Sequence, residues 1–231
     1  MSDVQDDPAT APGTRIDIVS DAICPWCYIG KRHLAGALAI LAEEGLHFSI
    51  RWNPFQLNPE MPAEGVARSA YRTAKFGSAA RAAELDANVT QAAAAAGLDF
   101  HLDRIARTPN TIDAHRLIWL GGRNGEQDAL TEALFAAYFT EGADIGDRAV
   151  LAAIAGQAGL DPVQVARFLD DGAMVEETRA ADRAAREAGV NGVPSFFLDG
   201  YALFSGAMPA AQMAEAFRRG NAVLRQRAAA E

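Results

Sequence analysis

The chain has 231 residues, half of them hydrophobic, so it can bury a sizeable core in one domain or in one domain with a large insertion. Its 30 acidic and 21 basic residues give a net charge of −9, and since nucleic acids are polyanions we expect no nucleic-acid partner. No apolar run approaches the length of a membrane-spanning helix, so we expect no membrane partner either.

Residues 1–13 are polar and carry two prolines and three aspartates, which predicts a disordered tail. This segment lacks the basic and apolar regions of a secretory signal peptide. We therefore expect a cytoplasmic protein.

The first regular elements are a strand and a helix. Residues 15–20 alternate between polar and apolar side chains and predict a strand with Ile16 and Ile18 on one face. From Cys27 onward, leucines recur at helical spacing until Gly45, which suits a helix end.

Between this strand and this helix stand the only two cysteines of the chain, in the sequence Cys24-Pro25-Trp26-Cys27. Their spacing suits reversible dithiol chemistry. The free N–H groups and positive dipole end of the first helical turn favour the Cys24 thiolate, and Pro25 fits the first helical position. Because Cys27 is in phase with the leucines, we expect an exposed nucleophile at Cys24 and a shielded resolving thiol at Cys27.

Two other roles for the cysteines are weaker. A zinc site needs about four ligands at suitable spacing, and the four histidines form no close pair with each other, so we expect no metal. An inert structural disulfide would close too short a loop to constrain the unfolded chain much.

Further along, residues 47–52 alternate in polarity and predict a second strand, parallel to the first. Residues 53–59 contain prolines that break regular structure near the sheet edge. From about residue 64 to residue 188 the sequence predicts almost continuous helix, with N-caps at Asp147 and Asp161.

The C-terminal part returns to the sheet. An apolar strand precedes Asp199-Gly200, a tight hairpin signal, and residues 201–204 supply the returning strand. A closing helix begins at Pro209. The aromatic residues expected to wall the site around the dithiol are Trp26, Tyr28, Trp52 and Phe55, although core packing explains Trp52 as well.

Four separated segments, in this order, resemble the FrnE-type subfamily of the DsbA-like branch of the thioredoxin superfamily. They are residues 20–31, residues 52–59, Asn110 with residues 114–117, and residues 204–207. The resemblance implies an α/β protein: a thioredoxin fold with a large inserted α-helical domain. It places the thioredoxin-fold domain at residues 14–62 and 189–231, and the helical insertion at residues 63–188.

The same resemblance implies a thiol–disulfide oxidoreductase in which Cys24 and Cys27 are catalytic. It makes Pro194 a cis-proline facing the dithiol and Val193 the residue whose backbone pairs with substrate, beside Pro25 and Trp26. A trans proline at the start of a strand is the alternative for Pro194. Asp21 is either a buried proton relay for Cys27 or a solvated loop aspartate. His115 is expected to be a packed helical histidine and is left outside the catalytic set.

Two other functions stay open. One is a glutathione-dependent isomerase or transferase, similar to 2-hydroxychromene-2-carboxylate isomerases and kappa-class glutathione transferases, with glutathione as co-substrate. Those relatives usually carry serine where this chain has Cys24. The other is a chaperone-like module that binds peptides along the Val193 edge. The expected partners are protein or small-molecule thiols and disulfides, with no cofactor required, and a homodimer is left open.

Overall fold

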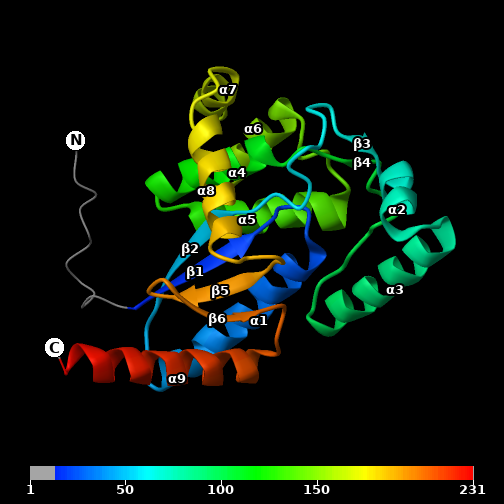
Figure 1. Ribbon diagram of the computed structural model, residues 1–231. Helices are drawn as coiled ribbons and strands as arrows, with labels where there is room; N and C mark the ends of the chain where they lie inside the picture. The colour runs from blue at the N-terminus through cyan, green and yellow to red at the C-terminus, as the bar shows by residue number, and fades with distance from the viewer. Residues whose placement is uncertain (1–13, 231) are drawn as a thin grey trace.

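The computed structural model describes residues 14–230, so the tail predicted at residues 1–13 lies outside the described residues. A mixed sheet with strand order β2-β1-β5-β6 forms the centre of the molecule (Figure 1). Its strands are β1 (Arg15–Ser20), β2 (Ser49–Pro54), β5 (Ser195–Leu198) and β6 (Tyr201–Ser205).

Strand β1 organises this sheet. It pairs in parallel with β2 from Arg15 opposite Ser49 to Ser20 opposite Pro54, and antiparallel with β5. The alternation expected from the sequence is confirmed, since Ile16 and Ile18 are completely buried. The second strand spans residues 49–54 instead of the predicted residues 47–52, because its pairing with β1 sets both of its ends.

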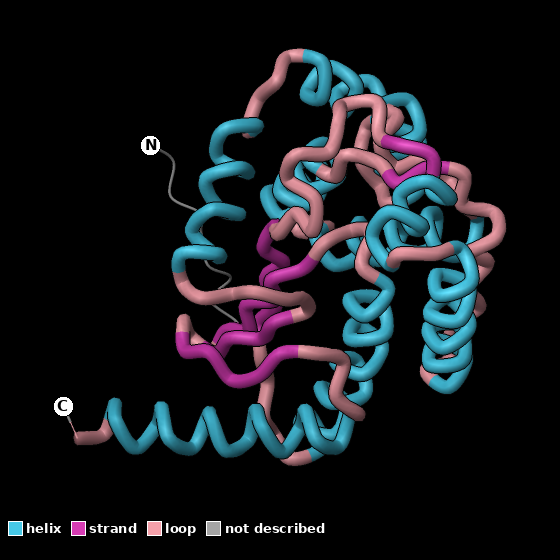
Figure 2. The backbone as a smooth tube through the Cα atoms, turned by 45° about the vertical axis from the view of Figure 1, so that its right-hand side comes forward, coloured by secondary structure: helices cyan, strands magenta, loops and turns pink. Residues whose placement is uncertain are grey.

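Helices cover the sheet. Figure 1 shows α1 and α9 on one side of it and α4, α5 and α8 on the other, and in Figure 2 the C-terminal helix again runs along the base of the molecule. The helices are α1 (Pro25–Glu43), α2 (Arg68–Phe76), α3 (Ala79–Ala95), α4 (Ile112–Arg123), α5 (Gln127–Ala136), α6 (Arg148–Gln157), α7 (Pro162–Asp170), α8 (Val175–Glu187) and α9 (Ala210–Ala228).

Local signals in the sequence account for many of these ends. The Asp147 side chain accepts hydrogen bonds from the backbone at the start of α6, and Asp161 does so at the start of α7. Between β5 and β6, Asp199 and Gly200 have φ angles of 45° and 84°, the left-handed backbone that a two-residue hairpin turn requires. These two N-caps and the hairpin are confirmed.

The region between β2 and β5 is not as uniformly helical as its sequence predicts. A second sheet pairs β3 (Val66–Ala67) with β4 (Arg107–Thr108), and a π-helical segment, η1 (Ala137–Glu141), continues α5. Strands of two residues are too short to leave a periodic pattern, so the sequence gives no warning of them. The division at residues 62/63 and 188/189 remains a prediction.

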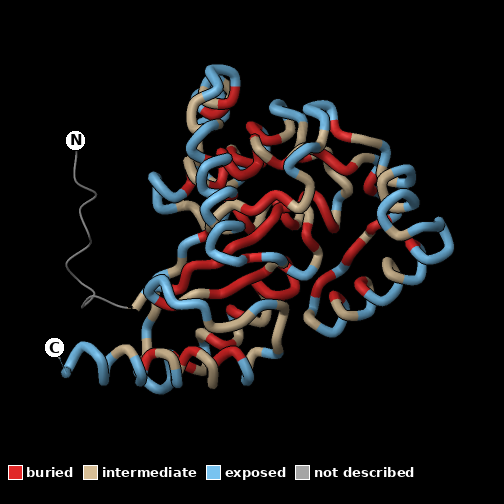
Figure 3. Tube along the Cα trace, in the orientation of Figure 1, coloured by how far each residue is buried: buried red, intermediate tan, exposed pale blue. Residues whose placement is uncertain are grey.

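The core of the molecule is continuous. One cluster of buried side chains runs from Ile16 and Ile18 in the sheet through Leu41 in α1 to Phe217 in α9 and Leu134 in α5. Figure 3 shows this burial concentrated in the sheet and in the helices that face it, while much of α3 is exposed. Within residues 14–230, no helix is both long and apolar enough to cross a membrane.

Candidate active site

The candidate site lies where β1 passes into α1. Cys24 is the N-cap of α1, with extended backbone at φ −90° and ψ 113°, and Pro25 follows at the start of the helix. No side chain caps this end of the helix, although the Cys27 N–H already donates to the Cys24 carbonyl oxygen at 3.0 Å. Such an end stabilises a thiolate.

Cys24 is more enclosed than the sequence suggests. Only 4% of its surface is exposed, and its Sγ lies 3.5 Å from the carbonyl oxygen of Val193. The expectation of an exposed nucleophile is therefore wrong for this structure, because the loop that carries Val193 comes from the other end of the chain and packs over the sulfur. Attack on a disulfide requires the substrate to approach past this loop.

Cys27 lies one turn further along α1 and has no exposed surface. Burial raises the pKa of its thiol well above the ordinary value, and the adjoining Cys24 sulfur raises it further. The nearby Ser20 hydroxyl and Asp21 backbone lower the pKa of Cys27, but by less than burial raises it. Both thiols are free in the structure, and Cys27 is the shielded one, as predicted.

The loop before β5 supplies the opposite wall. The Val193–Pro194 peptide bond is cis, as expected from the sequence. A Cβ atom placed on Gly30 of α1 would stand 3.0 Å from Cγ of Pro194, so the helix and this loop are in close contact just beyond the dithiol. Because Gly30 has no Cβ, the helix and the loop can approach each other this closely.

Of the four aromatic residues expected to wall the site, three lie in the core. The Tyr28 ring stacks on Phe135, with 5.0 Å between centroids, and Trp52 meets the same ring edge-on. Phe55 is buried in a smaller cluster on the other side. The expectation is wrong for Tyr28 and Phe55, because packing against the inserted helices takes up their faces, and for Trp52 the alternative of core packing is confirmed. Trp26, between the two cysteines, is 43% exposed.

Asp21 is completely buried, which excludes a solvated loop aspartate. Its Oδ2 accepts a hydrogen bond of 2.7 Å from the Leu57 backbone. Its Oδ1 lies 3.3 Å from Nε2 of His115 in α4, and His115 is also buried. Sequence reasoning left His115 outside the site, although the segment that contains it was one of the four family-like segments.

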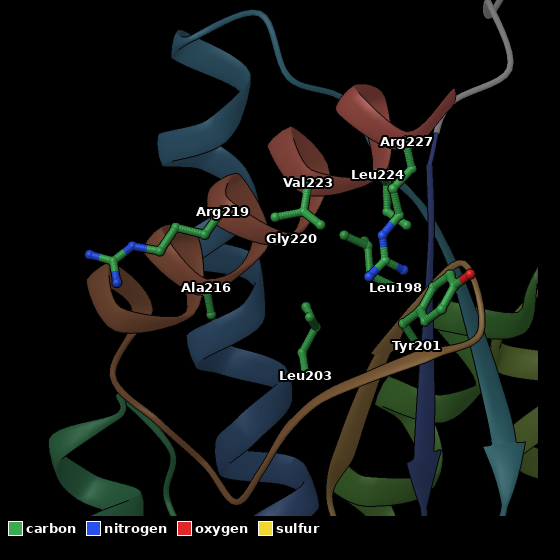
Figure 4. Close-up of a pocket in the computed structure, with 9 residues that line it drawn as sticks. All are labelled: Leu198, Tyr201, Leu203, Ala216, Arg219, Gly220, Val223, Leu224 and Arg227. Carbon is green, nitrogen blue, oxygen red and sulfur yellow. The ribbon is translucent and has the colours of Figure 1, made fainter. Parts of the chain in front are cut away.

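Three cavities lie near these elements, and one of about 170 Å³ borders Asn191 and Ser195 in the loop before β5 and at its start. The remaining two are larger. One of about 440 Å³ separates the β5–β6 hairpin from α9 and is lined mainly by apolar side chains with Arg219 and Arg227 at its rim (Figure 4). None of the predicted site residues lines it. The other, of about 220 Å³, is lined by both Ser20 and His115. No cluster of three or more metal-binding side chains occurs within residues 14–230.

Residues 15–218 match the model of the DSBA-like thioredoxin domain. The match spans the sheet, the dithiol and all of the helices between β2 and β5, and it ends within α9. The chain belongs to this family. The family membership confirms the predicted class of enzyme, a DsbA-like thiol–disulfide oxidoreductase, while the FrnE-type subfamily stays a prediction.

Solved structures agree with this family. A probable DsbA oxidoreductase from Streptomyces coelicolor is 33% identical, with 89% of each chain covered and a TM-score of 0.80. A 2-hydroxychromene-2-carboxylate isomerase shares the fold at 19% identity, covering 94% of this chain and 99% of its own, with a TM-score of 0.66. The cytosolic disulfide reductase DsbM from Pseudomonas aeruginosa shares it at 20% identity, covering 81% and 87%, with a TM-score of 0.58.

Proposed function

We propose that this chain catalyses thiol–disulfide exchange, with Cys24 as the nucleophile and Cys27 as the resolving thiol. The observation that carries the proposal is the asymmetry of the pair. Cys24 stands at the uncapped N-terminus of α1 beside the Val193 carbonyl, and Cys27 is fully buried one turn inside. Two-step exchange requires a nucleophile that substrate reaches first, here Cys24 once the substrate passes the Val193 loop, and a resolver behind it that substrate does not reach.

The exchange takes two steps. The Cys24 thiolate attacks one sulfur of a substrate disulfide, a mixed disulfide forms, and the other substrate sulfur leaves as a thiolate. Cys27 then gives up its proton and attacks the Cys24 sulfur, which expels the second substrate thiolate. Two electrons have passed to the substrate, and the enzyme ends with a Cys24–Cys27 disulfide. The same steps in reverse oxidise a substrate dithiol, so no cofactor is required.

The substrate would lie against the residues that surround Cys24. We assign Pro25, Trp26, Val193 and Pro194 to this contact, because Trp26 is exposed and Val193 presents its backbone beside the sulfur. Asp21 is assigned the relay that takes the Cys27 proton. Protein or small-molecule thiols and disulfides are the substrates that such a surface can accept.

A glutathione-dependent isomerase is the second candidate. The fold likeness to the 2-hydroxychromene-2-carboxylate isomerase supports it, and DsbM has been solved with glutathione, which makes glutathione a reasonable co-substrate to test. The presence of cysteine at both positions 24 and 27 favours exchange over isomerisation. A peptide-binding module would need neither thiol.

We also propose a cytoplasmic location. Both cysteines of the chain belong to the reactive pair, so none remains for the structural disulfides on which secreted proteins rely. Immunodetection in separated cell fractions tests this, and recovery of the protein outside the cytoplasm would contradict it.

The roles of the two thiols can be separated with Cys27→Ser and Cys24→Ser. Incubated with oxidised glutathione, Cys27→Ser should accumulate a mixed disulfide, seen in mass spectra as one added glutathionyl group that a reductant removes. Cys24→Ser should trap almost nothing, because its remaining thiol, Cys27, has no exposed surface and a pKa well above the ordinary value. Glutathione-dependent isomerisation of 2-hydroxychromene-2-carboxylate is assayed in parallel. If Cys27→Ser forms no adduct while isomerisation persists, the second candidate replaces the first.

A further inference from the structure

Asp21 and His115 form a buried pair outside the dithiol itself. Asp21 Oδ1 and His115 Nε2 are 3.3 Å apart, with the two side chains 0% and 3% exposed. Within the described residues neither atom makes a hydrogen bond of normal geometry, even to the other. A buried polar atom left unsatisfied is costly, so a proton delivered between these two atoms would satisfy both.

This pair is connected to the resolving thiol. The Ser20 hydroxyl and the Asp21 backbone lie close enough to the Cys27 thiol to lower its pKa, against the larger raising effect of burial. Ser20 is also buried, and it lines one cavity together with His115. A path of polar groups therefore runs from Cys27 past Ser20 to His115 and Asp21.

A cavity connects this path of polar groups to solvent. Its volume is about 220 Å³, and its lining runs from buried Ser20 and His115 to exposed Arg51 on β2 and Glu177 on α8. A water molecule in the liquid occupies about 30 Å³, so the space admits several. Cys27 itself has no exposed surface, and the cavity is the route by which a proton can leave its neighbourhood.

Few charged groups lie close enough to the Asp21–His115 pair to influence its proton. The Tyr138 hydroxyl of η1 lies close enough to Asp21 to sense its charge, and Arg51 and Glu177 face His115 across the cavity. Most other acidic groups on α4 and on the elements packed against it are paired with basic groups: Asp113 with Arg116 and Arg148, Asp128 with Lys31, Glu132 with Lys31 and Arg32, Asp170 with Arg148, Asp171 with Arg116, Glu176 with Arg179, and Asp182 with Arg186.

We propose that His115 is the partner that lets Asp21 accept the Cys27 proton when Cys27 resolves the mixed disulfide, and that the adjoining cavity returns this proton to solvent. The inference rests on the proposed exchange. In this step the Cys27 S–H bond breaks and its proton passes to the Asp21–His115 pair. The Cys27–Cys24 bond forms, and the bond from Cys24 to the substrate sulfur breaks, with that sulfur leaving as a thiolate. His115 touches neither substrate nor sulfur and is a positioning residue.

The test uses His115→Gln, whose amide can still bond Asp21 but cannot titrate. The matched control is His101→Gln, since His101 pairs with Asp99 at 3.1 Å on the surface. Reduced protein is mixed with oxidised glutathione and quenched with acid at successive times, between about pH 5.5 and pH 9. Mass spectra then separate the rate of adduct formation from the rate of its resolution.

In His115→Gln, resolution should be slowed at least about tenfold near neutral pH, less than the roughly 10²–10⁴-fold typical of a lost general base because Asp21 is still present, while adduct formation is unchanged. The difference in resolution rate between His115→Gln and the parent protein should become smaller at high pH, where hydroxide removes the Cys27 proton. His101→Gln should match the parent protein. Equal slowing of both steps, or resolution with the parent's pH profile, would overturn the inference. The adduct formed by Cys27→Ser decides the proposed function separately.

A second measurement does not depend on how His115→Gln folds. The chain has four histidines, and their ring signals can be followed by NMR against pH in the oxidised and in the reduced parent protein. Assignment comes from His33→Gln, His47→Gln and His101→Gln. Because coupling between two sites is reciprocal, the titration curve of His115 should be displaced when the dithiol is reduced. Identical His115 curves in the two states would contradict the proposal.

Discussion

Arg116 shows how one side chain joins distant parts of the inserted helices. Its guanidinium is completely buried and donates to the carbonyl oxygens of Phe168, Leu169 and Ala173, while Asp113 balances its charge. Two of these carbonyls belong to the last turn of α7, which has no helical partners of its own for them. The cation therefore satisfies the end of α7 and ties it to α4.

Arg116→Met should lower the free energy of unfolding by about 3–5 kcal/mol, because it leaves three carbonyl oxygens without their buried donor and leaves Asp113 with Arg148 alone. Urea denaturation measures the loss. Arg123→Met, near the exposed end of the same helix, should change stability by less than about 0.5 kcal/mol. A loss below about 1 kcal/mol for Arg116→Met would show that the buried contacts are replaced by water or by repacking.

Helix α1 has two structural roles. Its N-terminus holds the dithiol, and its length packs against α9, which lies beside it in Figures 1 and 2. Two glycines allow these approaches. A Cβ at Gly30 would meet Pro194 at 3.0 Å, and a Cβ at Gly36 would meet Ala210 at the same distance. Only the first contact borders the site.

Gly30→Ala and Gly36→Ala therefore form a matched pair. In each, a gain of about 1 kcal/mol in helix propensity is offset by crowding of about 1–3 kcal/mol, so their unfolding free energies should be similar. Gly30→Ala should also slow insulin reduction at least about threefold, because it displaces Pro194 relative to Cys24 and small misplacements at a reacting centre are costly. Equal insulin reduction by the two variants would show that this contact does not position the site.

At the scale of the whole molecule, segments far apart in sequence converge behind the dithiol. Asp21 binds the Leu57 backbone and faces His115, while Gln56 contacts Asn110 with its side chain. Three of the four family-like segments thus meet in one place. The inserted helices enclose the end of β1 next to the dithiol. The burial and the pKa of Cys27 therefore depend on the folding of the whole chain.

One consequence is a pH dependence of global stability. Folding raises the Cys27 pKa through burial, so the folded state of reduced protein holds this proton more tightly than the unfolded state. The stabilisation is fully present below the ordinary thiol pKa of about 8.5 and declines above it, by at most about 1.4 kcal/mol per pH unit.

Urea unfolding of reduced protein at about pH 7, 8.5 and 10 tests this sign. The parent should lose stability between the last two values, and Cys27→Ala should lose less. Oxidised parent protein, which has no thiol to titrate, serves as a second control. The same decline in Cys27→Ala as in the parent would assign the effect to other groups.

Residue type, spacing and local backbone preference are enough to predict the dithiol, the strands and helix around it, the hairpin, the caps and the family. The burial of Cys24, the core positions of Tyr28 and Phe55, the β3–β4 pair and the contact between Asp21 and His115 depend on the tertiary structure. Each depends on which distant segment packs against a residue, and periodicity along one element carries no information about that partner.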